Sequence, residues 1–416
     1  MNRRRFLQTA SCGLLVGTTS LPAIAATNTE KRFIFVFNPG GWDPTRVFAA
    51  EFSNNMVDME STATTATVGN ISFVAHPNRP SVSSFFQNFY HDLLVINGMQ
   101  VRSIAHEICT LIAMTGNTTD GSPDWTAILA AHAQNAYSLP HLVITGPSFP
   151  GKYGANVARS GSNGQLDGLL SGNIMEFIET EQHNLQLSTR AHRNILDSYV
   201  VGRGRAFQQK MKVGRAQDLS ASFLDAQQAG ISLQDYRYMM NFSGNTMNAN
   251  IDVAIDALRL GVSRCITLSG PTGWDSHAQN DETQSGLFEN LFEGLGYLKN
   301  KLDTTRNLSG VPLAENTIVV VLSEMGRTPQ LNATAGKDHW PYTSMLLWGS
   351  GIQGNRTIGK FDDYYLGMSI DPQTGDLAES GEILSVEGIG AGLLQLCDID
   401  PTQYIPDTTP LTTILS

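Results

Sequence analysis

The residues best suited to chemistry lie in the stretch TIVVVLSEMGRTPQLNATAGKDHWP, residues 317–341. Its apolar, β-branched start at 317–322 predicts a buried strand of a parallel sheet. Glu324 and Arg327 follow at the carboxyl end of that strand, where open α/β sheets bind their ligands, and His339 follows on a polar loop. A carboxylate, a guanidinium and an imidazole held by one buried strand indicate a ligand site.

Two other predicted strands end in residues of the same kind. The apolar run 31–38 leads through Pro-Gly-Gly-Trp to Asp43, and the two glycines let the backbone come close to a ligand. The run 264–268 leads to Gly-Trp-Asp-Ser-His, which contains Asp275 and His277. Because these residues are two positions apart, an extended loop turns both side chains to the same side, where they could bind one metal.

Metal ligands at one edge of the sheet would explain this pattern, and the predicted ligands are Asp43, Asp275, His277, Glu324 and His339. Carboxylates and imidazoles suit a divalent metal such as zinc, manganese, magnesium or calcium. Such a metal could polarise a phosphoryl or sulfuryl oxygen or lower the pKa of bound water, and Arg327 could hold an anionic ester oxygen. A plainer alternative stays open: a turn aspartate at 43, an ion pair between Glu324 and Arg327, and a hydrogen-bonding loop histidine at 339.

Strands and helices alternate along most of the chain, which predicts an α/β fold with a mostly parallel central sheet flanked by helices. The predicted strands lie at 31–38, 93–97, 140–146, 264–268, 317–322 and 344–348. The predicted helices lie at 80–90, 102–116 (after a short loop), 125–135, 247–260, 287–302 and 386–396. Residues 51–70 are rich in Ser, Thr, Asn and Ala and predict a surface excursion.

The composition changes between residues 150 and 245. Gly, Ser and Asn dominate at first, and a long polar helical stretch follows at about 173–229, without a strand-like alternation. We interpret 150–245 as a largely helical insertion or lid on a single domain that covers 26–416. A partner-binding arm is the alternative.

Residues 1–25 contain the three parts of a twin-arginine export signal in order. Arginines at 3–5 precede a modest apolar stretch at 12–21 and an A-x-A cleavage site at 23–25. We therefore expect a periplasmic or secreted protein whose mature chain begins near Ala26, with a disordered basic tail as the alternative. The apolar stretch is too short and too polar to span a membrane, so we expect no membrane span after the signal is removed.

Charge and cysteine content exclude several classes of protein. The net charge is −11, and the signal contributes three of the 27 basic residues and none of the 38 acidic ones. A mature chain this acidic argues against nucleic acid and anionic membrane surfaces as partners. Of the four cysteines, Cys109, Cys265 and Cys397 remain in the predicted mature chain, an odd number without a C-x-x-C, so neither a zinc ribbon nor a thioredoxin-type site is indicated.

The motifs together resemble those of a twin-arginine-exported bacterial family called domain of unknown function 1501, which is placed with the alkaline phosphatase and sulfatase superfamily. The resemblance covers most of the mature chain and rests on VFNPGGWD, RSIAHEICTLIAMTG, GWDSH, LSEMGRTP and GKDHWP. It implies an alkaline-phosphatase-like fold and a metal-dependent hydrolase or transferase of phosphate or sulfate esters. Its partner would be an anionic ester or an envelope glycan or lipid.

Carried over by position, the resemblance matches superfamily ligands to Asp43, Asp275, His277, Glu324 and His339. Met325 stands where the superfamily has a further histidine, and His106 stands where its nucleophile opens a helix that ends in Thr-Gly. His106 could be a nucleophile, a metal ligand or an acid/base group, and we expect His106 and Arg327 to be the catalytic residues. The alternative is a non-catalytic secreted protein that keeps the fold and binds a protein partner in the envelope.

Overall fold

The structure of the protein is a computed structural model, and the residues that it describes are 30–160, 190–211, 214–233, 236, 239–240 and 246–416. The predicted export signal at 1–25 lies outside the described residues, as does the 173–189 part of the predicted helical stretch.

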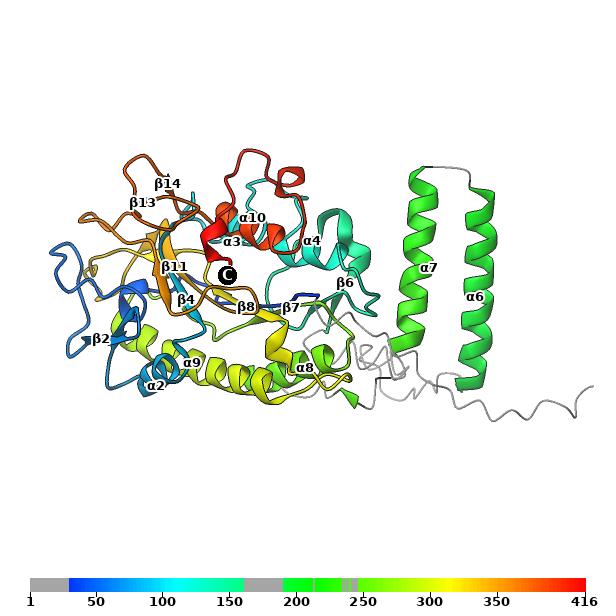
Figure 1. The fold of residues 1–416 in the computed structure, drawn as a ribbon, viewed down its shortest axis with the longest axis horizontal. Helices are drawn as coiled ribbons and strands as arrows, with labels where there is room; N and C mark the ends of the chain where they lie inside the picture. The colour runs from blue at the N-terminus through cyan, green and yellow to red at the C-terminus, as the bar shows by residue number, and fades with distance from the viewer. Residues whose placement is uncertain (1–29, 161–189, 212–213, 234–235, 237–238, 241–245) are drawn as a thin grey trace, which may run out of the picture.

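An eight-stranded sheet forms the centre of the fold (Figure 1). Its strands are β1 (Arg32–Phe37), β4 (Leu93–Gln100), β5 (His141–Val143), β6 (Val157–Arg159), β7 (Cys265–Ser269), β8 (Thr317–Leu322), β11 (Tyr342–Gly349) and β12 (Arg356–Ile358). The strand order is β12-β4-β11-β8-β1-β7-β5-β6. Among these described strands β11 alone runs antiparallel, to both β4 and β8. The predicted α/β fold with a mostly parallel sheet is therefore confirmed.

Alternate residues of the central strands contribute to two separate hydrophobic cores. In β1, Ile34 and Val36 lie in one core and Phe33, Phe35 and Phe37 in the other. The first core is covered by α2 (Pro80–Phe89), α8 (Met247–Arg259) and α9 (Asn280–Thr304), and the second by α3 (His106–Thr115), α4 (Trp125–Ala131) and α10 (Val386–Gln395). Because both faces are covered, β1 is apolar without polar alternation.

Several elements differ from the sequence prediction, and strand β12 of the central sheet was not predicted. Helix α9 begins at Asn280, before the predicted start at 287, because its first turns bury polar side chains that the apolar period does not show. A hairpin of β2 (Thr64–Val68) and β3 (Ile71–Ala75) lies partly in the stretch predicted as a surface excursion. Strand β6 forms the sheet edge within the part of the chain where no strand was predicted.

Smaller elements complete the body of the protein. Two short antiparallel pairs form, one between β9 (Gly326–Arg327) and β10 (His339–Trp340), the other between β13 (Ser369–Ile370) and β14 (Glu382–Ile383). The first pair matters for the site, because it folds the loop after β8 back on itself and brings His339 beside Arg327.

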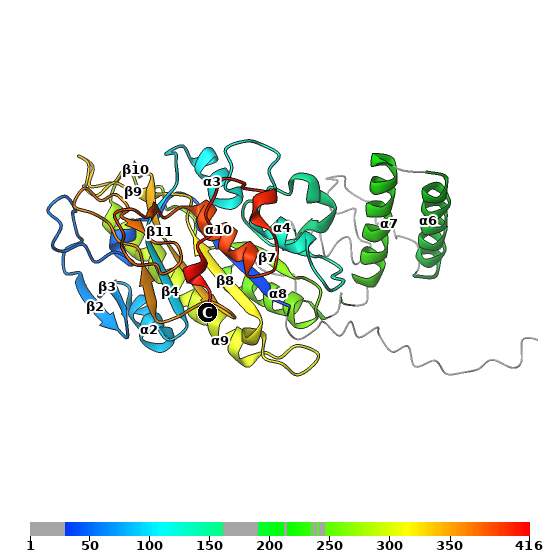
Figure 2. The same cartoon turned by 45° about the horizontal axis from the view of Figure 1, so that its top comes forward.

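Two long helices, α6 (Arg190–Lys210) and α7 (Arg215–Leu233), stand beside the sheet edge formed by β6 (Figures 1 and 2). They pack against each other and extend away from the body. Both lie within 150–245, the region interpreted as a helical insertion. Among the described residues, no helix combines the length and the apolar character that a membrane span requires.

Candidate metal centre

Two glycines bring three loops together at the carboxyl edge of the sheet. Gly40 and Gly41 follow β1 and have φ values of +120° and +79°, which favour glycine. A Cβ on Gly40 would lie 2.8 Å from the backbone nitrogen of Asp275, and one on Gly41 would lie 2.8 Å from Cγ of Met325. The loops after β1, β7 and β8 can therefore touch only because both positions lack a side chain.

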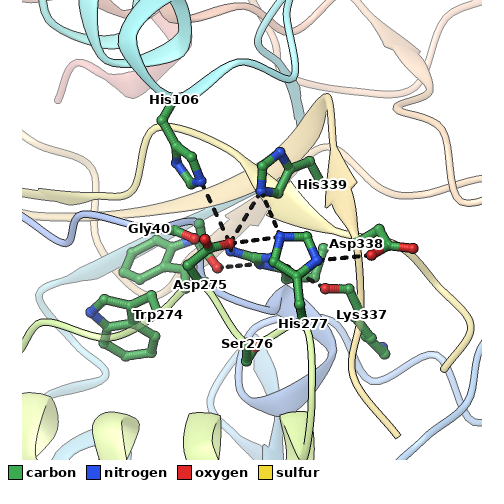
Figure 3. A network of polar contacts seen from close by, with 12 residues as sticks. Gly40, His106, Trp274, Asp275, Ser276, His277, Lys337, Asp338 and His339 are labelled. Atoms are coloured by element: carbon green, nitrogen blue, oxygen red, sulfur yellow. Dashed lines mark hydrogen bonds and ion pairs between the residues drawn. The ribbon is translucent and has the colours of Figure 1, made fainter. Parts of the chain in front are cut away.

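One carboxylate oxygen, Oδ1 of Asp275, lies at the centre of the site (Figure 3). Nη2 of Arg327 lies 2.6 Å from it, Nε2 of His277 3.0 Å, Nε2 of His339 3.1 Å and Nε2 of His106 3.5 Å. The structure thus brings together five residues that the sequence places on four separate segments. Three imidazoles present the same ring nitrogen to the same oxygen.

Hydrogen bonds on the far side of each ring orient these histidines. In every case Nδ1 lies within hydrogen-bond distance of an oxygen that can only accept: His106 with Glu324 (2.9 Å), His277 with Asp338 (2.8 Å) and His339 with the carbonyl of Ile104 (2.8 Å). Nδ1 therefore carries the proton, so the Nε2 lone pair of each neutral ring faces the cluster. Metal-binding histidines are commonly held in this way.

The cluster has the donors of a cation site. Nε2 of His277 and Nε2 of His339 are 3.1 Å apart, and the buried Nε2 of His106 has no hydrogen-bond partner. Converging lone pairs beside a carboxylate repel one another unless a proton or a metal lies between them. Ligand atoms of His106, Asp275 and His339 all lie within 4.8 Å of one another, so these residues fit a divalent metal with imidazole and carboxylate ligands.

Arg327 holds Asp275 in place. Its guanidinium is fully buried and donates to the carbonyls of Gly40, Gly41 and Lys337 as well as to Asp275. Burial alone would raise the pKa of Asp275, but the hydrogen bond and charge of Arg327, together with the adjacent imidazoles in their protonated form, outweigh burial and bring that pKa to about 2. The sequence suggested that Arg327 holds a substrate oxygen, whereas in the structure protein oxygens accept from all three of its nitrogens.

Glu324 supports His106. Its Oε1 accepts from Nδ1 of His106 and, at 2.6 Å, from the backbone N–H of Gly40, while its Oε2 accepts from the hydroxyl of Ser323 at 3.0 Å. The hydrogen bond to Glu324 raises the pKa of His106. Glu324 was predicted as a ligand, and in this structure it contacts the cluster through the ring of His106.

The structure does not bring Asp43 to the histidine cluster. Its carboxylate is fully buried, where Oδ1 accepts from Thr45 and Oδ2 accepts from Asn280 and lies 2.9 Å from Nζ of Lys337. Burial alone would raise the pKa of Asp43, but the charges of Lys337 and Arg46 outweigh it and hold that pKa below its ordinary value. A second, fully buried ion cluster thus lies beside the first.

Helix α3 begins at His106, as the resemblance implied for a nucleophile position. Its N-cap residue, Ala105, provides no side-chain hydrogen bond to the first turn. Cys109 in that turn is buried, and burial raises the pKa of its thiol to about 11, so it is not a reactive thiolate. The hydroxyl oxygen of Ser103 accepts from the N–H of Ala105.

Sequence reasoning did not include Lys337, Asp338 or the carbonyl of Ile104 among the site residues. Asp338 could have been found, because it lies within the GKDHWP motif beside His339. Lys337 gave no signal, since a lysine in a polar loop is ordinarily exposed. A backbone carbonyl acts through its position alone and has no signature in sequence.

The centre opens directly to solvent on one side. The side chains of Asp275 and His277 are each 46% exposed, whereas those of His106 and His339 are 32% and 21% exposed. A large molecule could therefore reach the cluster without passing through a narrow channel.

Comparison with known proteins identifies a family and a set of similar structures. The model of the family described as protein of unknown function (DUF1501) matches residues 30–405. No curated protein sequence shows significant similarity to the chain. The family match confirms the membership that the sequence motifs predicted.

Among solved structures, the chain is similar to a putative sulfatase from Bacteroides thetaiotaomicron, with 9% identity, 92% of this chain and 74% of that chain covered, and a TM-score of 0.39. It is also similar to a protein in the alkaline phosphatase superfamily from Vibrio parahaemolyticus, with 10% identity, 93% and 71% covered, and a TM-score of 0.36. A third similar structure contains its substrate D-glucosamine-2-N,6-O-disulfate, with 10% identity, 92% and 82% covered, and a TM-score of 0.36.

Proposed function

We propose that this chain, which belongs to the DUF1501 family of proteins of unknown function, is a divalent-metal-dependent hydrolase or transferase of phosphate or sulfate esters. One observation carries the proposal. Three imidazole rings direct their Nε2 atoms at one carboxylate oxygen, at the carboxyl edge of a mostly parallel sheet. In each ring, Nδ1 is hydrogen-bonded to an acceptor oxygen. Open α/β sheets place their ligands at this edge.

The residues divide into those that would bind the metal and those that orient them. His106, His277, His339 and Asp275 would hold the ion, while Glu324, Asp338 and Arg327 fix their rings and carboxylate. A divalent metal so held supplies a Lewis acid for an ester oxygen and lowers the pKa of a bound water. Zinc, manganese, magnesium and calcium are the candidates, and the three imidazoles favour zinc.

The start of α3 would bind the anionic part of the substrate. First-turn N–H groups of a helix lack intrahelical partners, and they attract anions. His106 is the first residue of α3, so the first-turn N–H groups lie next to one of the proposed ligands. They would hold the ester oxygens in place of Arg327, whose nitrogens already donate to protein oxygens.

Water is the attacking group that the site favours. The first turn of α3 offers no hydroxyl, and its thiol, Cys109, is buried and protonated. In His106, Nδ1 is hydrogen-bonded to Glu324 and Nε2 faces Asp275. This is the arrangement of a metal ligand rather than of a free nucleophile.

A non-catalytic binding protein is the second candidate. It is favoured by the complete engagement of Arg327, which leaves no free guanidinium at the cluster to stabilise a transition state. In that case the metal centre would bind an anionic envelope glycan or lipid, or a protein partner, without turnover.

The experiment uses the mature protein exported from its own host, with metal content and ester turnover measured on the same sample. We expect about one divalent ion per chain and turnover of a generic aryl phosphate or aryl sulfate. His339→Ala should lose both, whereas His91→Ala, a histidine on the exposed surface, should retain both. Metal binding without turnover of either ester class would favour the binding protein, and absence of a retained metal would contradict the proposed centre.

Export by the twin-arginine route forms part of the proposal. It is supported by the arginines at 3–5, the apolar stretch and the A-x-A site in residues 1–25. Replacing the three arginines by lysine should leave the protein in the cytoplasm, as measured by cell fractionation. Periplasmic accumulation of that variant would contradict this route.

A further inference from the structure

Asp43 and Lys337 form an ion pair that stability alone does not explain. Both side chains are fully buried, with 2.9 Å between Nζ and Oδ2. Taking two charges out of water is costly, and replacing a buried ion pair by neutral residues is often neutral or stabilising. The pair therefore calls for a role other than stabilising the core.

Lys337 belongs to a segment that contacts both Arg327 and the loop of Asp275 and His277. Its carbonyl accepts from Nη1 of Arg327, and its N–H donates to the carbonyl of Ser276. The next residue, Asp338, orients the ring of His277, and the one after it is the predicted ligand His339.

The segment lies tightly against the loop that carries Asp275 and His277. A Cβ on Gly336 would lie 1.9 Å from both the carbonyl carbon and the oxygen of His277, so only glycine permits this approach. Gly336 has no side chain of its own, and the side chains of Asn332 and Thr334 before it donate to the carbonyl of His277 at the surface. The ammonium of Lys337 reaches into the interior, where it contacts Asp43 and the hydroxyl of Thr45.

We propose that the buried pair Lys337–Asp43 is a positioning element of the metal centre. It joins the loop after β1 to the segment 336–339 and so sets where His277 and His339 face Asp275. Lys337 and Asp43 act through these residues and do not touch the metal or the substrate. This inference rests on the proposed metal-dependent function.

The test compares two double variants of the full chain, each of which replaces a buried ion pair by neutral side chains of similar size. The first is Lys337→Met with Asp43→Asn, in which the amide oxygen of residue 43 still accepts from Thr45. The matched control is Glu30→Gln with Arg264→Met, a pair that is also about 97% buried and lies just before β1 and β7, at the opposite edge of the sheet.

Two measurements are made on each folded protein. The first is the Kd for Zn²⁺ by calorimetry, and the second is hydrogen exchange of the metal-free protein over 326–340. We expect the first variant to bind Zn²⁺ about 10- to 100-fold more weakly, the range for outer partners of metal ligands, and to lose exchange protection over 326–340. The control should show the wild-type Kd and wild-type protection in this segment.

An unchanged Kd together with unchanged protection in the first double variant would overturn the positioning role. If wild type binds no metal, the proposed function fails, and exchange protection in the metal-free protein still decides whether the pair positions 326–340. Should the first double variant not fold, Thr45→Val removes the hydroxyl that contacts both Asp43 and Lys337. We then expect a smaller fall in affinity, of a few fold, and wild-type affinity in that variant would count against the pair.

Discussion

Two Gly-Trp-Asp sequences occupy neighbouring positions in this fold and have opposite surroundings. Asp43 follows β1 and Asp275 follows β7, and the tryptophans before them pack edge to face with ring centroids 6.3 Å apart. The carboxylate of Asp43 is fully buried, whereas the side chain of Asp275 is 46% exposed. The same three residues thus produce a closed ion cluster at one position and an open centre at the other.

The difference lies in what surrounds each carboxylate. Asp43 faces the ammonium of Lys337 and the guanidinium of Arg46, both fixed cations supplied by the chain. Asp275 has one fixed cation, Arg327, and three imidazoles whose Nε2 atoms converge on it. A carboxylate between fixed cations is already neutralised, whereas one among imidazole lone pairs can take a further cation from solution.

Breaking the closed cluster should have the largest effect on stability. Lys337→Met leaves the buried charge of Asp43 without its nearest partner, which typically costs about 3–5 kcal/mol in the free energy of unfolding. Urea denaturation measures this loss. Adding Asp43→Asn should recover much of it, because the uncompensated charge is then gone. If Lys337→Met is as stable as wild type, the carboxylate of Asp43 does not depend on a fixed buried cation, and this difference between the two clusters is contradicted.

Breaking the open centre should instead remove the metal. Asp275→Ala deletes the carboxylate on which all three Nε2 atoms converge, so we expect divalent-metal affinity to fall by at least about 100-fold. Elemental analysis and calorimetry check this, with the exposed Glu379→Ala as a control that keeps the metal. Retention of wild-type affinity would exclude Asp275 as a ligand.

Weakening the support of one histidine should have an intermediate effect. Glu324→Gln keeps an acceptor for Gly40 but removes the charge beside Nδ1 of His106, and such outer partners contribute about 10- to 100-fold in affinity. Because the hydrogen bond to Glu324 raises the pKa of His106, the variant should also shift the pH dependence of metal binding to lower pH. Calorimetry at several pH values measures both changes.

The smallest expected effect is the contribution of the closed cluster to the pH dependence of stability. The pKa of Asp43 is lowered in the folded protein, so its contribution is present above the ordinary aspartate pKa of about 3.9 and is lost as the pH falls below it. One such group changes the free energy of unfolding by at most about 1.4 kcal/mol per pH unit. The metal-free double variant Asp43→Asn, Lys337→Met should therefore lose less stability between pH 4 and pH 2 than wild type, in urea titrations.

Much of the architecture was predictable because local sequence carries it. The run 317–322 is apolar and β-branched throughout and forms β8 with the predicted ends. Gly116 ends α3 in the left-handed conformation, as a glycine after an apolar helical pattern indicates. Elements whose burial depends on polar residues were missed in part, such as the start of α9 at Asn280.

The sequence by itself determined which residues reach the carboxyl edge of the sheet, because apolar strands followed by Gly, Asp, Glu and His are visible in the order of residues. Only the tertiary structure decided which way each side chain faces. Asp43 turns inward because Lys337, from a distant loop, supplies a buried cation, and Asp275 turns outward because Arg327 holds it beside three imidazoles. These partners are far apart in the chain, and their charges meet only when the strands pair.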